Sequence, residues 1–245
     1  MVQSNSLVNI LLKNKPLFNK VVPFNAGTDR LLLMDFTGSN TTLTPGIIDD
    51  TTKFSNYVSR VLQTSNCRYG IGGYNEHRTL YARSAVFDAD KYALTAGKAA
   101  EPRRLHLGID IWGDAGTPVY VPVGGVVHSF GFNNNYGDYG ATIILQHQLD
   151  GIVFHTLYGH MSLADLAPLK EGKFVSQGEV IAHFGLPHEN GNWPPHLHFQ
   201  LIKDMRVMKG DYPGVCTISE QGYYLENCPD PDLILQMMSY AKPTI

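Results

Sequence analysis

The second half of the chain constrains the fold most, because from Arg103 onward it consists of short apolar runs between glycine- and proline-rich turns. The runs carry many β-branched and aromatic residues: TPVYVPVGGVVHSFGF, ATIILQHQL, IVFHTLYGHM, KFVSQGEVIAHFG and HLHFQLI. The turn signals between them are NNNYGDYG, LDG, KEGK and HENGNWPP. Many short strands at close spacing are typical of an antiparallel β sandwich or barrel. We therefore expect a mainly β fold, or a β-rich α+β fold.

The first hundred residues predict a structure of mixed type. Residues 30–36 (RLLLMDF) predict a buried strand, and residues 49–62 predict a helix with an acidic N-terminal cap. Residues 79–87 alternate enough to predict another strand. Residues 88–102 are rich in small and polar side chains, which is typical of a linker or surface loop.

These patterns divide the chain into two parts. We expect an N-terminal extension of mixed structure at residues 1–101 and a β-rich domain at residues 102–245, whose core spans residues 103–203. Near the end of the chain, PDPDLILQMMSYAK predicts a closing helix that begins around Pro231. With 43% apolar residues among 245, the chain can bury a sizeable core.

Charge and hydropathy exclude several partner classes. The chain has 19 basic and 22 acidic residues, so its net charge of -3 gives no reason to expect nucleic acid or an anionic membrane as partner. No run approaches the roughly 18 apolar residues of a membrane-spanning helix. The N-terminal sequence also lacks the apolar run and cleavage site of a secretory signal. As read, the chain is expected in the cytoplasm, or exported if a signal has been removed; nothing indicates its oligomeric state.

The sharpest chemical motif is the pair of histidines His196 and His198 in the strand-like segment HLHFQLI. Side chains alternate faces along a strand, so both imidazoles project to one side. Such a pair suits a metal ligand beside a proton-transfer group. Two exposed histidines on a strand surface are the alternative.

A second motif, HLGID, contains His106 and Asp110. Imidazole nitrogen and carboxylate oxygen are both zinc ligands. In a fully extended strand, residues four apart are roughly 13 Å apart, so sharing a metal requires a bend. Gly108 is the residue that permits one. A strand capped by histidine, with no metal, is the alternative.

A third motif places His160 in YGHMS at the end of an apolar strand. A histidine beside a glycine at a strand end is suited to the rim of a cleft, although a turn histidine without a role is the alternative. Together the three motifs are more informative. Catalytic zinc sites use three protein ligands and leave a fourth position for water, whose pKa the metal lowers to about 7. A histidine outside the metal's ligand set can then transfer protons.

The combined motifs resemble those of the lysostaphin-type (LytM-like) zinc metallopeptidases, many of which cleave peptide cross-links in bacterial cell walls. That family carries an HxxxD motif, a later Tyr-Gly-His-Leu/Met-Ser-like segment and a C-terminal HxH, which correspond here to HLGID, YGHMS and HLH in the same order. The stretches GTPVYVPVGGVV and GKFVSQGEVIAHFG also resemble family patterns. The resemblance covers residues 103–203.

The resemblance implies a zinc-dependent metalloendopeptidase that hydrolyses peptide bonds with a water activated by the metal. It implies that His106, Asp110 and His198 bind one zinc ion per chain. It also implies that His160 and His196 form the catalytic pair, one as general base and the other stabilising the tetrahedral intermediate. The resemblance does not indicate which histidine has which role. It also implies a peptide or peptidoglycan-derived substrate and a β-rich fold with a narrow groove over the metal.

The chain departs from the family pattern at three places that are expected to border the groove. Residues 186–195 replace a Gly/Ser/Thr-rich turn, Gln200 replaces a common glutamate, and residues 133–140 look inserted. Because of these departures, the resemblance does not determine which peptide substrate the chain binds. A further hypothesis is that the polar segment YNEHR, residues 74–78, borders the groove and brings Asn75 or Glu76 to the fourth metal position. An ordinary polar turn is the alternative.

Two other functions compete with the peptidase. The first is a non-catalytic binding or scaffold module with a peptidase-like fold, which typically loses ligands or catalytic histidines; none is lost here. The second is a histidine phosphocarrier, because a similar β fold uses two neighbouring histidines for phosphoryl transfer. That function has no use for HLGID as a ligand pair. Zinc content and turnover distinguish the three.

Overall fold

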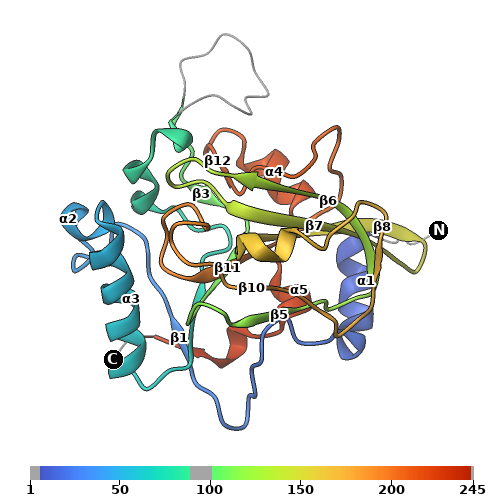
Figure 1. The fold of residues 1–245 in the computed structure, drawn as a ribbon, viewed down its shortest axis with the longest axis horizontal. Helices are drawn as coiled ribbons and strands as arrows, with labels where there is room; N and C mark the ends of the chain where they lie inside the picture. The colour runs from blue at the N-terminus through green and yellow to red at the C-terminus, as the bar shows by residue number, and fades with distance from the viewer. Residues whose placement is uncertain (1–5, 89–100, 244–245) are drawn as a thin grey trace.

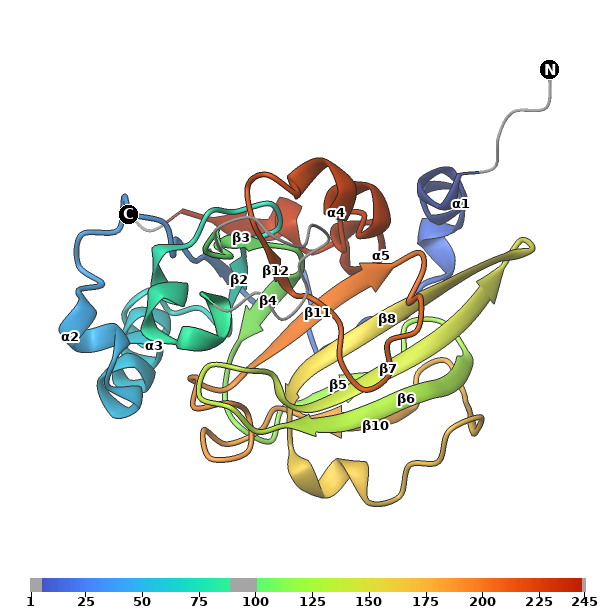
Figure 2. The same cartoon turned by 90° about the horizontal axis from the view of Figure 1, so that it is seen from above.

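A large mixed sheet dominates the computed structural model, which describes residues 6–88 and 101–243 (Figures 1 and 2). Its nine strands run in the order β13-β1-β2-β4-β11-β8-β7-β6-β9, without closing into a barrel. The strands are β1 (Leu31–Leu33), β2 (Tyr69–Gly72), β4 (Ile109–Trp112), β6 (Gly125–Asn133), β7 (Gly140–Leu149), β8 (Ile152–Met161), β9 (Phe174–Val175), β11 (His196–Ile202) and β13 (Ala241–Lys242). The mainly β fold predicted from the sequence is confirmed.

Two small sheets complete the β structure of the described residues. One pairs β5 (Pro118–Tyr120) with β10 (Val180–His183), and the other pairs β3 (Leu105–His106) with β12 (Val215–Cys216). The strands between residues 105 and 216 pair antiparallel with one another, as predicted. Parallel pairing occurs only where β1 meets β2 and β13, among the described strands.

Strands from the N-terminal extension lengthen the main sheet. β1 confirms the strand predicted at residues 30–36, and β2 pairs antiparallel with β4, with Gly72 opposite Asp110. Every residue of β2 and β4 is buried. The division at residues 101 and 102 stays a prediction, but the two parts share one sheet.

The helices are short and lie at the periphery of the sheet. They are α1 (Leu7–Asn14), α2 (Pro45–Ile48), α3 (Thr51–Thr64), α4 (Gln221–Asn227) and α5 (Asp232–Leu235), with 3-10 turns η1 (Lys15–Leu17), η2 (Thr79–Arg83), η3 (Ala85–Phe87), η4 (Leu163–Leu166) and η5 (Met238–Tyr240). In Figures 1 and 2, α1 and α3 lie at opposite ends of the molecule. No helix among the described residues is long and apolar enough to cross a membrane.

Helix α3 confirms the predicted acid-capped helix. The carboxylate of Asp50 accepts hydrogen bonds from the backbone N–H groups of Thr52 and Lys53, which satisfies two otherwise unpaired donors of the first turn. The buried face of the helix, with Phe54 and Val58, packs into the cluster that contains Trp112. The helix therefore supports β4, the strand that carries Asp110.

The strand predicted at residues 79–87 is wrong, because this segment forms η2 and η3. Local hydrogen bonds replace sheet pairing: the N–H of Ser84 bonds the carbonyl of Tyr81, and the N–H of Phe87 bonds the carbonyl of Ser84. The hydroxyl of Ser84 also accepts from the N–H of Val86 and caps η3. Most of the loop predicted at residues 88–102 lies outside the described residues.

The closing helix is shorter than predicted. It begins after Pro231, as expected, but α5 ends at Leu235 because Gln236 adopts a left-handed conformation with φ of 52°. The chain then passes through η5 into β13, which pairs with β1. The apolar residues that suggested a continuing helix instead fill the core beside β1, with Ile234, Leu235 and Met237 buried.

Candidate metal centre

Three neighbouring strands bring His106, Asp110 and His198 together. His198 in β11 lies directly opposite Asp110 in β4, and β11 pairs on its other side with β8. The chain leaves β3 at His106 and enters β4 at Ile109, so the predicted bend lies between them. A Cβ on Gly108 would lie 2.5 Å from Cε1 of His198, so only glycine leaves room for that imidazole.

The donor atoms of these three residues form a small triangle. His106 Nε2 lies 2.8 Å from His198 Nδ1, His198 Nδ1 lies 3.1 Å from Asp110 Oδ1, and His106 Nε2 lies 3.3 Å from Asp110 Oδ1. Tetrahedral ligands about 2.0–2.1 Å from zinc lie roughly 3.3 Å from one another. All three side chains are buried, and they are the one group of this kind among the described residues. The donor set and its spacing fit a zinc ion.

Hydrogen bonds to neighbouring groups orient the imidazoles of His106 and His198. The carbonyl of Gly73 can only accept, so His106 donates to it through Nδ1, at 2.9 Å, and keeps the lone pair of Nε2 for a metal. His198 Nε2 lies 2.9 Å from Gln200 Oε1. The amide nitrogen of Gln200 donates to the carbonyl of Pro213, so its oxygen faces His198 and receives the Nε2 proton. Gln200, a departure from the family pattern, therefore still fixes the tautomer of His198.

His160 and His196 form a stacked pair beside the triangle, with ring centroids 4.0 Å apart and an angle of 30° between the rings. Trp112 stacks on the other face of His196, with centroids 3.8 Å apart. His160 Nδ1 donates to the carbonyl of Asn190 at 2.8 Å, and His196 Nδ1 donates to the carbonyl of Pro194 at 2.7 Å. Both rings therefore present an unprotonated Nε2 when they are neutral.

The backbone at His160 is unusual, since its φ of 67° lies in the left-handed region that non-glycine residues rarely adopt. The carbonyl of Asn190 that receives His160 is itself held by the fully buried Asn190 side chain, which donates to the carbonyls of Gly185 and Trp193. Residues 186–195, which replace the family's usual turn, thus hold the imidazole of His160 through the backbone carbonyl of Asn190. Sequence analysis missed the role of Asn190, because asparagine is common in turns.

Burial sets the protonation of the site. It lowers the pKa of His106 to about 3, with a further lowering from the nearby Arg78 cation, and it lowers the pKa of His196 to about 4. The pKa of His160 is likewise lowered well below its usual value by burial. Burial alone would raise the pKa of Asp110, but His106 and Arg78 hold it well below its usual range. At neutral pH the site therefore offers the Asp110 carboxylate and neutral imidazoles at His106, His160 and His196.

Arg78 is a functional candidate to which no separate role was assigned from the sequence. Its guanidinium is buried and lies 2.5 Å from Asp110 Oδ2. The proposed occupants of the fourth position lie elsewhere: Asn75 is exposed and accepts from Gln221, and Glu76 pairs with Arg78 at 2.6 Å. The segment of residues 74–78 does border the site, but through its last residue.

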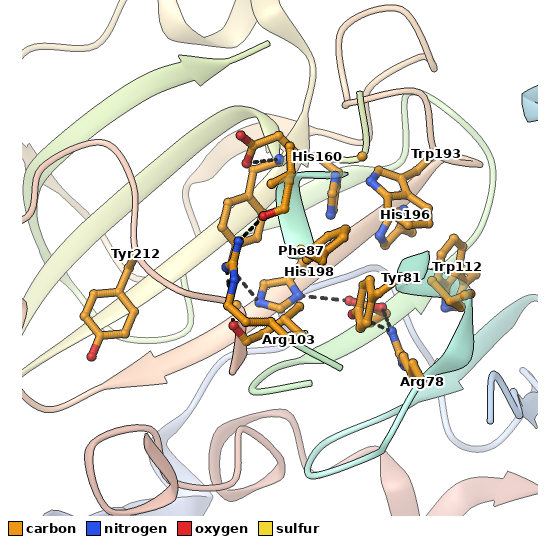
Figure 3. A pocket seen from close by; sticks show the side chains of 18 residues that line it. Arg78, Tyr81, Phe87, Arg103, Trp112, His160, Trp193, His196, His198 and Tyr212 are labelled. Carbon is orange, nitrogen blue, oxygen red and sulfur yellow. Dashed lines mark hydrogen bonds and ion pairs between the residues drawn. The ribbon is translucent and has the colours of Figure 1, made fainter. Parts of the chain in front are cut away.

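A pocket surrounds these side chains, and Figure 3 shows aromatic residues gathered around the imidazoles. Its aromatic lining consists of Tyr81, Phe87, Trp112, Tyr139, Trp193 and Tyr212. Tyr81 and Phe87 come from η2 and η3, so the N-terminal extension forms one wall. His160, His196 and His198 are each at most 6% exposed. The resemblance predicts a narrow groove over the metal, and the imidazoles here lie buried at a pocket that η2 and η3 border.

Residues 104–210 match the model of "Peptidase family M23". A "DD-carboxypeptidase/endopeptidase Mpg" of Neisseria meningitidis serogroup B is 33% identical over 130 residues, covering 53% of this chain and 26% of that protein. An "L-Ala--D-Glu endopeptidase" of Bacillus subtilis is 31% identical over 107 residues, covering 42% of this chain and 31% of that protein. The chain thus spans less than a third of the length of these curated relatives.

Solved structures give a weaker likeness. The catalytic domain of lysostaphin from Staphylococcus simulans is 19% identical and covers 69% of this chain and 96% of that chain, with a TM-score of 0.37. A zinc-containing peptidase from Vibrio cholerae is 26% identical and covers 51% of this chain and 35% of that chain, with a TM-score of 0.33.

Proposed function

We propose that this chain is a zinc-dependent metalloendopeptidase that hydrolyses peptide bonds, and the match of residues 104–210 to the model of peptidase family M23 supports this. One observation carries the proposal: a buried triangle of two imidazoles and a carboxylate lies beside two further imidazoles whose Nε2 atoms are left unprotonated. The first group is a ligand set and the second is a pair of proton acceptors.

His106, Asp110 and His198 would hold the zinc ion, through Nε2, Oδ1 and Nδ1 respectively. When bound, zinc supplies Lewis acidity and brings the pKa of a bound water to about 7. The chain's own part is to orient these donors through Gly73 and Gln200 and to exclude bulk water by burial.

His160 and His196 would move the protons. At neutral pH both Nε2 atoms are lone-pair acceptors, so one of them takes the proton of the attacking water and later delivers it to the leaving amine. Two imidazolium rings with centroids 4.0 Å apart would repel each other, so the pair carries one added proton at a time. The stack with Trp112 holds His196 in place and offers a π face to the charged ring.

The substrate class that we propose is a peptide link in peptidoglycan. The support is the names of two relatives, a DD-carboxypeptidase/endopeptidase and an L-Ala--D-Glu endopeptidase. Such a substrate would require the protein to act outside the cytoplasm, in place of the location expected from the N-terminal sequence.

A non-catalytic binding module is the second candidate, and the burial of the imidazoles is the observation that favours it. Zinc content and peptidoglycan cleavage together distinguish the peptidase from the binding module. Elemental analysis of the purified chain should give about one zinc per chain, which is lost in a His106→Ala variant. Incubation with isolated peptidoglycan should release soluble peptide fragments, detected by mass spectrometry. A folded chain that stays metal-free after zinc loading overturns the peptidase; zinc without cleavage supports the binding module.

A further inference from the structure

Arg78 makes an uncommon contact, because it is a fully buried cation paired with a proposed metal ligand. Asp110 divides its two oxygens: Oδ1 faces the imidazoles of His106 and His198, and Oδ2 receives the guanidinium of Arg78. The exposed fraction of the Arg78 side chain is 1%. Figure 3 shows Arg78 approaching the site from the side opposite His160 and His196.

The remaining contacts of Arg78 fix the guanidinium in this position. Its Nε donates to Glu76, one terminal nitrogen donates to the carbonyl of Gly72 at 3.2 Å, and the ring of Phe36 lies under it at 5.3 Å. A Cβ on Gly73 would lie 1.7 Å from the guanidinium. The backbone of β2 and the following turn is thus shaped to admit this side chain.

The charge of Asp110 is therefore only partly compensated without a metal. Arg78 supplies one positive charge, whereas Asp110 and Glu76 supply two negative charges, so the ion-pair cluster keeps a net charge of -1. A buried carboxylate left without a cation would be strongly destabilising. Arg78 provides that cation in the position next to the one that zinc would take.

We propose that Arg78 is a positioning residue that acts as a counter-ion to Asp110, an inference that rests on the proposed zinc site. Arg78 keeps the three proposed ligands together when no metal is bound, and it weakens the binding of zinc. Two effects of opposite sign are involved. An outer hydrogen bond that orients a ligand strengthens metal affinity by about 10- to 100-fold. Two cations that share one carboxylate repel, and a single pair of unit charges about 4 Å apart at an effective dielectric constant of about 20 changes an equilibrium by roughly a thousandfold. The loss of zinc affinity from charge repulsion therefore exceeds the gain from orienting the Asp110 carboxylate.

The test is zinc affinity, measured by competition with a chromophoric chelator, on the full chain and four variants. Arg78→Met should bind zinc about tenfold or more tightly than the native chain, because it removes the competing charge. Glu76→Gln should bind zinc several-fold more weakly, by about 3- to 10-fold, because it leaves Arg78 without its partner charge. Arg78→Lys, which keeps the charge, should stay within about threefold of the native value.

The two opposite signs distinguish this role from a merely structural one, since damage to the fold would weaken zinc binding in both charge variants. Arg68→Met, which removes a surface ion pair with Asp29, is the matched control and should leave affinity unchanged. If Arg78→Met does not fold, Arg78→Lys and Glu76→Gln carry the test together: native affinity in Arg78→Lys with weakened affinity in Glu76→Gln supports the inference, and unchanged affinity in Glu76→Gln overturns it. Native protein that binds one zinc with the same affinity as Arg78→Met refutes only the Arg78 role. Native protein that binds none refutes the zinc site and this inference together.

Discussion

The imidazole rings of His160 and His196 are stacked 4.0 Å apart, although the two residues lie on different strands and each donates its Nδ1 proton to a different backbone carbonyl. The arrangement leaves both Nε2 atoms unprotonated at neutral pH. It suits groups that accept and return one proton during hydrolysis, and it separates them from the three donors proposed to hold zinc.

Replacing either stacked histidine should abolish hydrolysis without removing the metal. His160→Ala and His196→Ala are each expected to lower kcat/KM by about 10²- to 10⁴-fold, the usual contribution of a general acid or base. Zinc content should stay near one per chain in both. His188→Ala, at an exposed position in the neighbouring loop, is the control and should leave both quantities unchanged. Full activity in either variant would remove that histidine from the mechanism.

Gly108→Ala should disturb zinc binding, because the added Cβ would lie 2.5 Å from His198 Cε1 and 2.9 Å from the carbonyl of Phe199. We expect zinc affinity to fall by about tenfold or more, in line with the effect of misplacing a ligand. The chelator competition assay measures this. Gly46→Ala is the matched control, since nothing lies within 4 Å of a Cβ at that position. Equal zinc affinity in both variants would contradict the close approach.

Acid should destabilise the metal-free protein through buried histidines outside the site. Burial lowers the pKa of His147 to about 4 from an unfolded value of 6.5. Between these values the unfolded chain binds more protons than the folded one, so stability is complete above pH 6.5 and is lost as the pH falls toward 4. Each such group contributes at most about 1.4 kcal/mol per pH unit. Denaturant unfolding between pH 7 and 4 should show this slope, and it should be shallower in His147→Gln; an identical slope would refute the assignment.

Removing residues 1–80 should unfold the chain instead of activating it. The deletion eliminates β1 and β2, and β2 pairs with β4 beside Asp110. It also removes Arg78 and leaves the Asp110 carboxylate buried without that cation. Circular dichroism and a thermal melt of the truncated protein would check this. A cooperative melt close to that of the full chain, with hydrolysis increased, would show that the extension is a separable inhibitor.

The strands are predicted by local patterns, and the proposed ligand triangle is predicted by those patterns together with the family resemblance. The alternation in HLHFQLI places His196 and His198 on one face, and Gly108 marks the bend that returns His106 toward Asp110. The contacts that complete the site depend on residues far apart in the chain. Arg78 lies in a polar segment that reads as an ordinary turn, and nothing near it in the sequence indicates its pairing with Asp110.

The segment at residues 79–87 shows the same limit. Its apolar residues alternate like those of a strand, but Ser84 satisfies the backbone locally and the segment forms 3-10 turns. Gln200 and Asn190 are similar cases, since their roles depend on which carbonyl each amide meets. Spacing therefore predicts a strand only where no local hydrogen bond competes, and the partner of a side-chain amide depends on tertiary packing.

The wall formed by Tyr81 and Phe87 has a kinetic consequence for the proposed peptidase. If a peptide substrate of the proposed peptidase has to displace this wall to reach the buried imidazoles, η2 and η3 open once in each catalytic cycle. Turnover would then be governed by the frequency of this opening, and not by the bond-breaking step. Solvent viscosity would slow such an enzyme, while replacing the attacking water with heavy water would change its rate little.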